Sequence, residues 1–149
     1  MLDVDFRIRD AAPSDAVELA ALMCELGYET TTSEMTMRLM SILPNEAYKT
    51  FVAIVDNRVS GMIGTFVHTS YEHGDLSGRI LALVVSKRVS RCGIGRALLV
   101  AAESDFARRR ITRIAVDTRL TRTDAHKFYE ALGYERNGWR FVKNLAIEK

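Results

Sequence analysis

The stretch SRCGIGRALLVAAE, residues Ser90 to Glu103, decides how the middle of this chain folds. Gly93 and Gly95 lead into an alanine- and leucine-rich segment without a helix breaker, which predicts a turn and then a helix to about Arg109. The preceding run RILALVVS, residues 79–86, is almost wholly apolar and predicts a central strand covered on both faces. A strand, a glycine turn and a helix in succession present unpaired backbone N–H groups, which favour an anion.

The side chains around this turn leave two interpretations open. Gly93 and Gly95 lack a Cβ, so a diphosphate can approach the backbone closely, and Arg91 and Arg96 can add charge-assisted hydrogen bonds. The alternative is a glycine turn needed only for close packing of helix on strand. Two known phosphate motifs do not fit. A dinucleotide fingerprint needs a third glycine three residues after Gly95, and a P-loop needs Gly-Lys-Ser/Thr where residues 95–97 read Gly-Arg-Ala.

Composition predicts one globular domain over residues 1–149. The chain is 48% hydrophobic and 27% charged with a net charge of +2, and the Arg108–Arg110 run lacks interleaved aromatic residues, so we expect no nucleic-acid partner. The two cysteines, Cys24 and Cys92, are not arranged in a CxxC motif or another pattern typical of a zinc site or a disulfide framework. We therefore expect a reducing compartment and no bound metal. No apolar run approaches the ~20 residues of a membrane span, and the N-terminus lacks a signal core. We therefore expect a cytoplasmic protein without a membrane partner.

The first half of the chain reads as a strand, two helices and a hairpin. DFRIRDA alternates as a strand, and a helix opens at Pro13–Asp15 with Glu18 as capping-box partner of Asp15 and Gly27 as its stop. A second helix is predicted from Ser33 to Leu43, before Pro44. The β-rich runs 48–56 and 58–71 meet at Asp56–Asn57, a strong hairpin signal. Met35, Met37 and Met40, with Leu39 and Leu43, indicate either an apolar wall near an acceptor site or plain core packing.

The second half predicts a strand at 111–118, a helix in TRTDAHKFYEALGY and a closing strand at 140–147. The helix has a Thr121–Asp124 capping box, apolar residues at helical spacing and Gly133 as its stop. Together the elements predict a mixed α+β fold with one central sheet, antiparallel early and parallel where a helix connects two strands. Tyr129 lies within the apolar stripe of the last helix, where it is either a half-buried core residue or a phenol able to donate to a thiolate.

The pairing of ALVV and RCGIGRALL with AHKFYEALGYE about thirty residues later resembles the GNAT superfamily of N-acetyltransferases. The resemblance covers essentially the whole chain. It implies a mostly antiparallel mixed sheet flanked by about four helices. It also implies acetyl-CoA as co-substrate, no metal, and direct transfer of the acetyl group to a primary amine in a ternary complex.

By this resemblance, the turn holds the coenzyme A diphosphate, the strand before it runs beside the pantetheine arm, and Tyr129 is the catalytic acid. The residues implied in cofactor binding are Leu83, Val84, Val85, Arg91, Cys92, Gly93, Ile94, Gly95, Arg96, Arg122, Ala125 and Phe128. A backbone N–H near Val84 is the implied oxyanion donor. The chain departs from the family at Ser90, where arginine or glutamine is usual, and at Arg122, where asparagine is frequent. Arg91 or Arg88 can compensate for the loss at Ser90.

The general base is not defined by the resemblance, because the glutamate that many members carry on the strand before the turn is absent here. Candidates for a substrate-binding residue or base are Glu29, His68, Glu72 and His73, and Glu25 and Asp75 are further carboxylates nearby in sequence. A base acting through water, or no base at all, is also open.

Within the superfamily, the chain resembles small-molecule amine acetylators, including the aminoalkylphosphonate N-acetyltransferases. An acceptor with a phosphonate or carboxylate calls for an arginine such as Arg79 or Arg119, whereas a polycationic aminoglycoside calls for an acidic cleft. A non-catalytic acyl-CoA sensor and a Rossmann-like nucleotide-binding unit are the alternatives from other classes. A homodimer is compatible with pairing of end strands.

Overall fold

The computed structural model describes residues 4–117 and 123–146. It divides into two compact units, Met1–Val116 and Asp117–Lys149, which we describe separately. The first unit contains a five-stranded sheet in the order β1-β2-β3-β4-β5. The second contains the helix α4, Thr123–Ala131.

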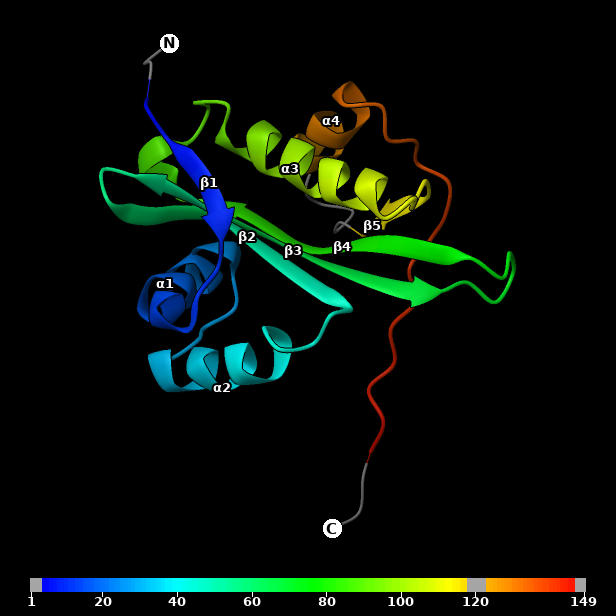
Figure 1. Ribbon diagram of the computed structural model, residues 1–149, viewed down its shortest axis with the longest axis horizontal. Coiled ribbons are helices and arrows are strands. Elements are labelled where there is room, and N and C mark those ends of the chain that lie inside the picture. The colour runs from blue at the N-terminus through cyan, green and yellow to red at the C-terminus, as the bar shows by residue number, and fades with distance from the viewer. Residues whose placement is uncertain (1–3, 118–122, 147–149) are drawn as a thin grey trace. The chain divides into compact units, whose positions relative to one another are not determined.

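The sheet is antiparallel except at one edge (Figure 1). Its strands are β1 (Arg7–Asp10), β2 (Tyr48–Val55), β3 (Arg58–Thr69), β4 (Leu76–Val85) and β5 (Ile114–Val116). The one parallel pair, β4 with β5, follows the helix α3 (Ile94–Arg108), because a crossover must return the chain to the same end of the sheet. The mixed α+β fold class, with a mostly antiparallel sheet, is confirmed.

Two helices cover one face of the sheet and α3 covers the other (Figure 1). The first two are α1 (Ala16–Leu26) and α2 (Thr32–Ile42), which bury a core against β2, β3 and β4. On the opposite face, Phe106 of α3 is fully buried and packs against Gly78 of β4. A Cβ added at Gly78 would lie 2.7 Å from the Phe106 ring, so only glycine permits this approach of helix and strand.

Local turn chemistry matches the sequence prediction at two places. Asp56 and Asn57 have φ values of 51° and 63°, which the hairpin between β2 and β3 requires. Gly27 ends α1 with a φ of 112°. The helix α2 begins one residue before the predicted Ser33, because the Thr31 hydroxyl accepts from the Glu34 N–H while Glu34 accepts from the Thr31 N–H.

The predicted capping box of Asp15 with Glu18 is wrong, because both carboxylates have more distant partners. Asp15 accepts two hydrogen bonds from Arg9, at 2.8 and 2.9 Å, and one from the Ala12 N–H. Arg9 lowers the pKa of the Asp15 carboxyl, and Asp15 raises the pKa of Arg9. Glu18 accepts a 2.5 Å hydrogen bond from the Val59 N–H at the start of β3. The part-buried ion pair fixes the start of α1, and Glu18 joins this helix to the sheet.

Two further predictions about strands need correction. Residues 140–146 form no β-strand, so the predicted closing strand is absent from the part of it that the structure describes. The strand β4 is not covered along both faces, because Leu81 is 54% exposed. The predicted Thr121–Asp124 capping box lies partly outside the described residues, as does the end of the closing strand.

Candidate active site

The glycine turn forms an open helix start immediately after β4. Residues Lys87–Val89 make one 3-10 turn, Arg91 takes a φ of 61°, and Gly93 caps α3 with a φ of 81°. Among the described residues, no side chain caps the helix start. The N–H groups of Ile94, Gly95 and Arg96 lie in the first turn of the helix and therefore have no intrahelical acceptor. A Cβ added at Gly93 would meet nothing within 4 Å. The turn thus combines free donors, the positive end of a helix dipole and open space.

The cations of this region differ in their availability. Arg91 and Arg96 are exposed beside the helix start. Arg88 instead donates a 2.7 Å hydrogen bond to the hydroxyl of buried Ser60 and so ties the turn to β3. The thiol of Cys92 is part-buried and lies 3.6 Å from the Ser90 carbonyl. Arg91 is therefore better placed than Arg88 to compensate for serine at position 90.

The strand β4 leaves one edge without a strand partner close to this turn. Among the described residues, β5 pairs only with Gly78, Arg79 and Ile80. The Ser86 N–H donates to the Ser60 carbonyl, so by antiparallel alternation Val84 and Ala82 direct their backbone groups toward β3. Leu83 and Val85 direct theirs to the other edge. We call the backbone edge of Leu83 and Val85 the open edge of β4.

A β-bulge marks the beginning of the open edge. The register between β3 and β4 shifts between Gly64 and Thr65, which leaves Leu81 as the extra residue on β4. Leu81 and Ala82 line a cavity of about 140 Å³ between the sheet and the α1/α2 layer. Three methionines, Met23, Met35 and Met62, share that lining, and we call it the methionine cavity. Of the methionine-rich segment, Met35 and Leu39 reach the cavity, whereas Met37 and Met40 are 65% and 66% exposed.

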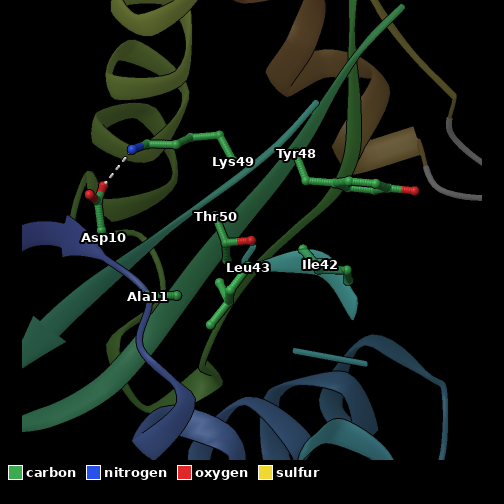
Figure 2. A pocket seen from close by; sticks show the side chains of 7 residues that line it. All are labelled: Asp10, Ala11, Ile42, Leu43, Tyr48, Lys49 and Thr50. Atoms are coloured by element: carbon green, nitrogen blue, oxygen red, sulfur yellow. Dashed lines mark ion pairs between the residues drawn. The ribbon is translucent and has the colours of Figure 1, made fainter. Parts of the chain in front are cut away.

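Figure 2 shows the residues that line a second cavity, which has a volume of about 140 Å³. It shares Ile42, Tyr48 and Thr50 with the methionine cavity. Its rim carries the ion pair of Lys49 with Asp10, whose charged atoms are 3.1 Å apart. This second cavity is lined by charged side chains of both signs, whereas Arg38 is the one charged residue that lines the methionine cavity among the described residues.

Three of the predicted base candidates lie at the tip of the β3–β4 hairpin. His68 pairs across the strands with Ser77, eight residues before Val85. At ~3.3 Å per residue this is roughly 26 Å from the end of β4 that leads into the turn. Glu72 and His73 lie further out, where the Ser70 hydroxyl donates to Glu72 and accepts from the His73 N–H.

The carboxylate of Glu72 is also a weak base. Its own backbone N–H and the Ser70 hydroxyl lower the pKa of Glu72, and His73 and His68 add to the effect. A group whose pKa lies further below neutrality accepts a proton less readily at neutral pH. His68 stacks on Phe66 with ring centroids 6.0 Å apart.

Two glutamates lie at the other end of the site, next to the end of α1. Glu25 accepts a 2.9 Å hydrogen bond from the Lys87 N–H, which joins the helix to the turn after β4. Glu29 is exposed and directly precedes Thr30, whose hydroxyl accepts from Arg38 at the wall of the methionine cavity. Among the predicted base candidates, Glu29 is thus the neighbour in sequence of a residue, Thr30, that hydrogen-bonds to the cavity wall.

Tyr129 belongs to the second compact unit. It lies on α4, is 9% exposed, and meets Phe128 and Tyr134 edge to face with ring centroids 5.2 and 5.6 Å apart. The helix stop at Gly133 has a φ of 93°. Ala125 and Phe128 are part-buried on the same helix, and Arg122 lies outside the described residues. The role of Tyr129 and its pairing with the turn stay predictions.

The cavity residues contributed by the sheet were missed from the sequence. Tyr48, Thr50, Met62 and Leu81 come together only through strand register and the bulge. One signal was available, because a glycine inside a strand pattern, here Gly64, indicates a bulge or a close approach. In the described ranges, no three metal-ligating side chains gather into one group. No helix of the described residues is long and apolar enough to cross a membrane.

Comparisons with known proteins agree with this arrangement. A model of the acetyltransferase (GNAT) family matches residues 17–134. A curated aminoalkylphosphonate N-acetyltransferase of Salmonella typhimurium is 30% identical over 143 residues, 93% of this chain and 90% of that protein. The crystal structure of a GNAT family acetyltransferase from Staphylococcus aureus superposes with a TM-score of 0.81 at 26% identity, covering 94% of this chain and 98% of that one.

A more distant likeness shows the fold alone. An aminoglycoside 6'-N-acetyltransferase from Acinetobacter haemolyticus has a TM-score of 0.80 at 16% identity, over 95% of this chain and 99% of that one. The family match spans both compact units and most of the sequence. The chain therefore belongs to the GNAT family and is an acetyl-CoA-dependent N-acetyltransferase.

Proposed function

We propose that this enzyme transfers the acetyl group of acetyl-CoA directly to the primary amine of a small molecule, with both substrates bound together. One observation carries the proposal: the uncapped start of α3 lies immediately after β4, whose open edge has no strand partner among the described residues. Free N–H donors suit a diphosphate, and an unpaired strand edge suits the amides of a pantetheine arm.

Cofactor binding follows from these two features. The diphosphate accepts hydrogen bonds from the N–H groups of Ile94, Gly95 and Arg96, and Arg91 adds positive charge. The pantetheine arm hydrogen-bonds to the backbone of Leu83 and Val85, because the backbone N–H and C=O groups of Val84 point toward β3. The oxyanion donor that the resemblance puts near Val84 is then the N–H of one of these two neighbours.

The reaction removes two protons from the acceptor nitrogen, one before the attack and one after it, and delivers one proton to the coenzyme A sulfur. The ammonium group of the acceptor loses a proton, the neutral nitrogen attacks the thioester carbonyl, and a backbone N–H on the open edge stabilises the oxyanion. The C–N bond forms in the attack, the cationic nitrogen then loses its second proton to solvent, and the C–S bond breaks as the intermediate collapses to the neutral amide. The phenol of Tyr129 donates its proton to the departing thiolate, and solvent restores it.

We assign the first proton transfer to Glu29, directly or through water. Its support is that it directly precedes Thr30, whose hydroxyl accepts a hydrogen bond from Arg38 of the cavity wall. The hairpin-tip residues His68, Glu72 and His73 are less suited, because they are far along the strands and the pKa of Glu72 is lowered.

The test is release of free CoA with and without an amine. We expect release to depend on the amine and to saturate with both substrates, with initial-rate lines that intersect. Parallel lines would indicate an acetyl-enzyme intermediate and contradict direct transfer. Binding of acetyl-CoA without release for any amine would support a sensor instead.

Relatives and composition support the remaining parts of the proposal. The curated relative is named for aminoalkylphosphonates, which are small amines. Both cysteines are free thiols, which supports a reducing compartment such as the cytoplasm. The homodimer, and the absence of nucleic-acid and membrane partners, stay predictions.

A further inference from the structure

We infer that the acceptor is a monoamine with an apolar body about the size of one six-membered ring, and that this body occupies the methionine cavity. The inference rests on the proposed function and names the substrate class of the same site. Its evidence is the chemistry of the cavity wall, the volume of the cavity and its place on the sheet.

The wall of the methionine cavity is almost entirely apolar. Its lining includes the apolar side chains of Met23, Met35, Leu39, Met62 and Leu81. Methionines adapt their shape and present polarizable sulfur to an aromatic ring. Burying an apolar group against these side chains is favourable, whereas a hydrated polar group would lose water without a partner.

The charges at this wall argue against a polycation. No carboxylate lines the cavity among the described residues, and its one charged side chain is Arg38. Arg38 donates a 3.2 Å hydrogen bond to the Thr30 hydroxyl, which holds the guanidinium at the rim. An acceptor with several ammonium groups would meet a like charge in the wall, and no carboxylate lining the cavity would pair with its additional cations.

The volume sets the size of the body. A dry apolar cavity of about 150 Å³ accommodates benzene. The methionine cavity, at about 140 Å³, is close to that size. A phenyl ring or a branched alkyl group fills such a space, whereas a two-carbon chain leaves much of the wall uncovered and a multi-ring sugar exceeds it.

The place of the cavity fits the reaction. Leu81 and Ala82 belong both to its wall and to the bulge where the open edge of β4 begins. A ring held against Leu81 keeps its attached aminomethyl group next to the strand that binds the pantetheine arm. The polar second cavity, across Tyr48 and Thr50, leaves room for a polar substituent on the far side of the body.

The first test is a panel of acceptors at saturating acetyl-CoA, read as CoA release and as the acetylated product by mass spectrometry. Benzylamine and isoamylamine represent the apolar class, ethylamine the truncated body, 2-aminoethylphosphonate the anionic class and kanamycin the polycations. We expect kcat/KM for benzylamine to exceed that for ethylamine by at least ~10-fold, the discrimination that one methylene gives in an apolar pocket.

Gly64 offers a variant that fills the cavity from the sheet. A Cβ at Gly64 would meet only the flexible Met62 Cε, at an ordinary 3.6 Å, so Gly64→Ala adds volume without a clash, and Gly64→Val adds two further methyl groups at the same position. We expect Gly64→Val to lower the benzylamine-to-ethylamine ratio of kcat/KM ~10-fold or more, with Gly64→Ala intermediate. Val100→Leu is the control, because Val100 is half-exposed on α3, on the opposite face of the sheet.

A binding measurement supplies a readout independent of turnover. N-acetylbenzylamine titrated into the enzyme–CoA complex is expected to bind with a negative heat-capacity change, which Gly64→Val reduces. The apolar acceptor would be ruled out if the enzyme preferred 2-aminoethylphosphonate or kanamycin, or if Gly64→Val left the benzylamine-to-ethylamine ratio of kcat/KM unchanged. Either result would leave the proposed acetyl transfer intact. Failure to acetylate any amine despite acetyl-CoA binding removes the proposed function, and this inference with it.

Discussion

Replacing Gly93 by alanine separates backbone strain from cofactor binding at the turn. Gly93 has a φ of 81°, and a Cβ there would meet no atom within 4 Å. The variant Gly93→Ala therefore creates no clash within the protein, and its cost is that of holding an L residue in the left-handed region, ~1–2 kcal/mol. For a chain of 149 residues, each kcal/mol lowers Tm by ~2–4 °C, so we expect a loss of roughly 2–8 °C.

The same substitution is expected to weaken acetyl-CoA binding. The added methyl group stands in the open space next to the N–H groups of Ile94, Gly95 and Arg96, where the diphosphate is proposed to bind. Losing one charge-assisted hydrogen bond costs ~1.5–3 kcal/mol, which is about 10- to 100-fold in Kd. Calorimetric titration with acetyl-CoA measures this change, and thermal denaturation measures the strain.

Gly74→Ala is the matched control. Gly74 has a φ of 73°, its added Cβ would also meet no atom within 4 Å, and it lies at the hairpin tip away from the turn. We expect the same loss of Tm and an unchanged Kd for acetyl-CoA. If both variants lose stability alike and both bind acetyl-CoA as the wild type does, the turn does not hold the diphosphate.

Three further predictions concern chemistry and stability. Tyr129→Phe is expected to lower kcat ~10²–10⁴-fold with little change in KM for acetyl-CoA, and steady-state kinetics with an unchanged kcat would remove its role as acid. Because Arg9 lowers the pKa of Asp15 below its unfolded value of ~3.9, the pair stabilises the fold above about pH 4 and loses that contribution as the pH falls through the folded pKa. Urea unfolding of Asp15→Asn should therefore show a loss of ~1.5–3 kcal/mol at pH 7 that shrinks below pH 4, and a pH-independent loss would contradict the ion pair. Gly78→Ala should cost ~1–3 kcal/mol by denaturant unfolding, because its Cβ would press on the Phe106 ring, and a neutral effect would show that the ring can move.

Local signals in the sequence predicted much of the fold. The Asp56–Asn57 turn, the helix stop at Gly27 and the glycine turn at Gly93 each depend on a backbone conformation that few residue types adopt. Glycine, asparagine and aspartate tolerate positive φ, so these residue types indicate a turn or a helix end even when the partner strands are unknown. The hairpin, the helix ends and the strand–turn–helix unit could therefore be read directly.

Long-range contacts were not readable in this way. Asp15 and Glu18 have the spacing of a capping box, yet Asp15 pairs with Arg9 instead. Glu18 accepts a hydrogen bond from the Val59 N–H, 41 residues further along the chain. The alternation at 140–147 predicts an extended amphipathic segment but names no partner strand. The methionine cavity also depends on a bulge and on three strands in register, none of which a local pattern specifies.

The most direct measurement of the central claim is an amide NMR titration of the enzyme with coenzyme A. Hydrogen bonds to a diphosphate should move the N–H resonances of Ile94, Gly95 and Arg96 strongly downfield at a common saturation point, while the Gly74 resonance at the hairpin tip stays in place. Saturating binding that leaves those three resonances unmoved would contradict the claim that the start of α3 holds the cofactor.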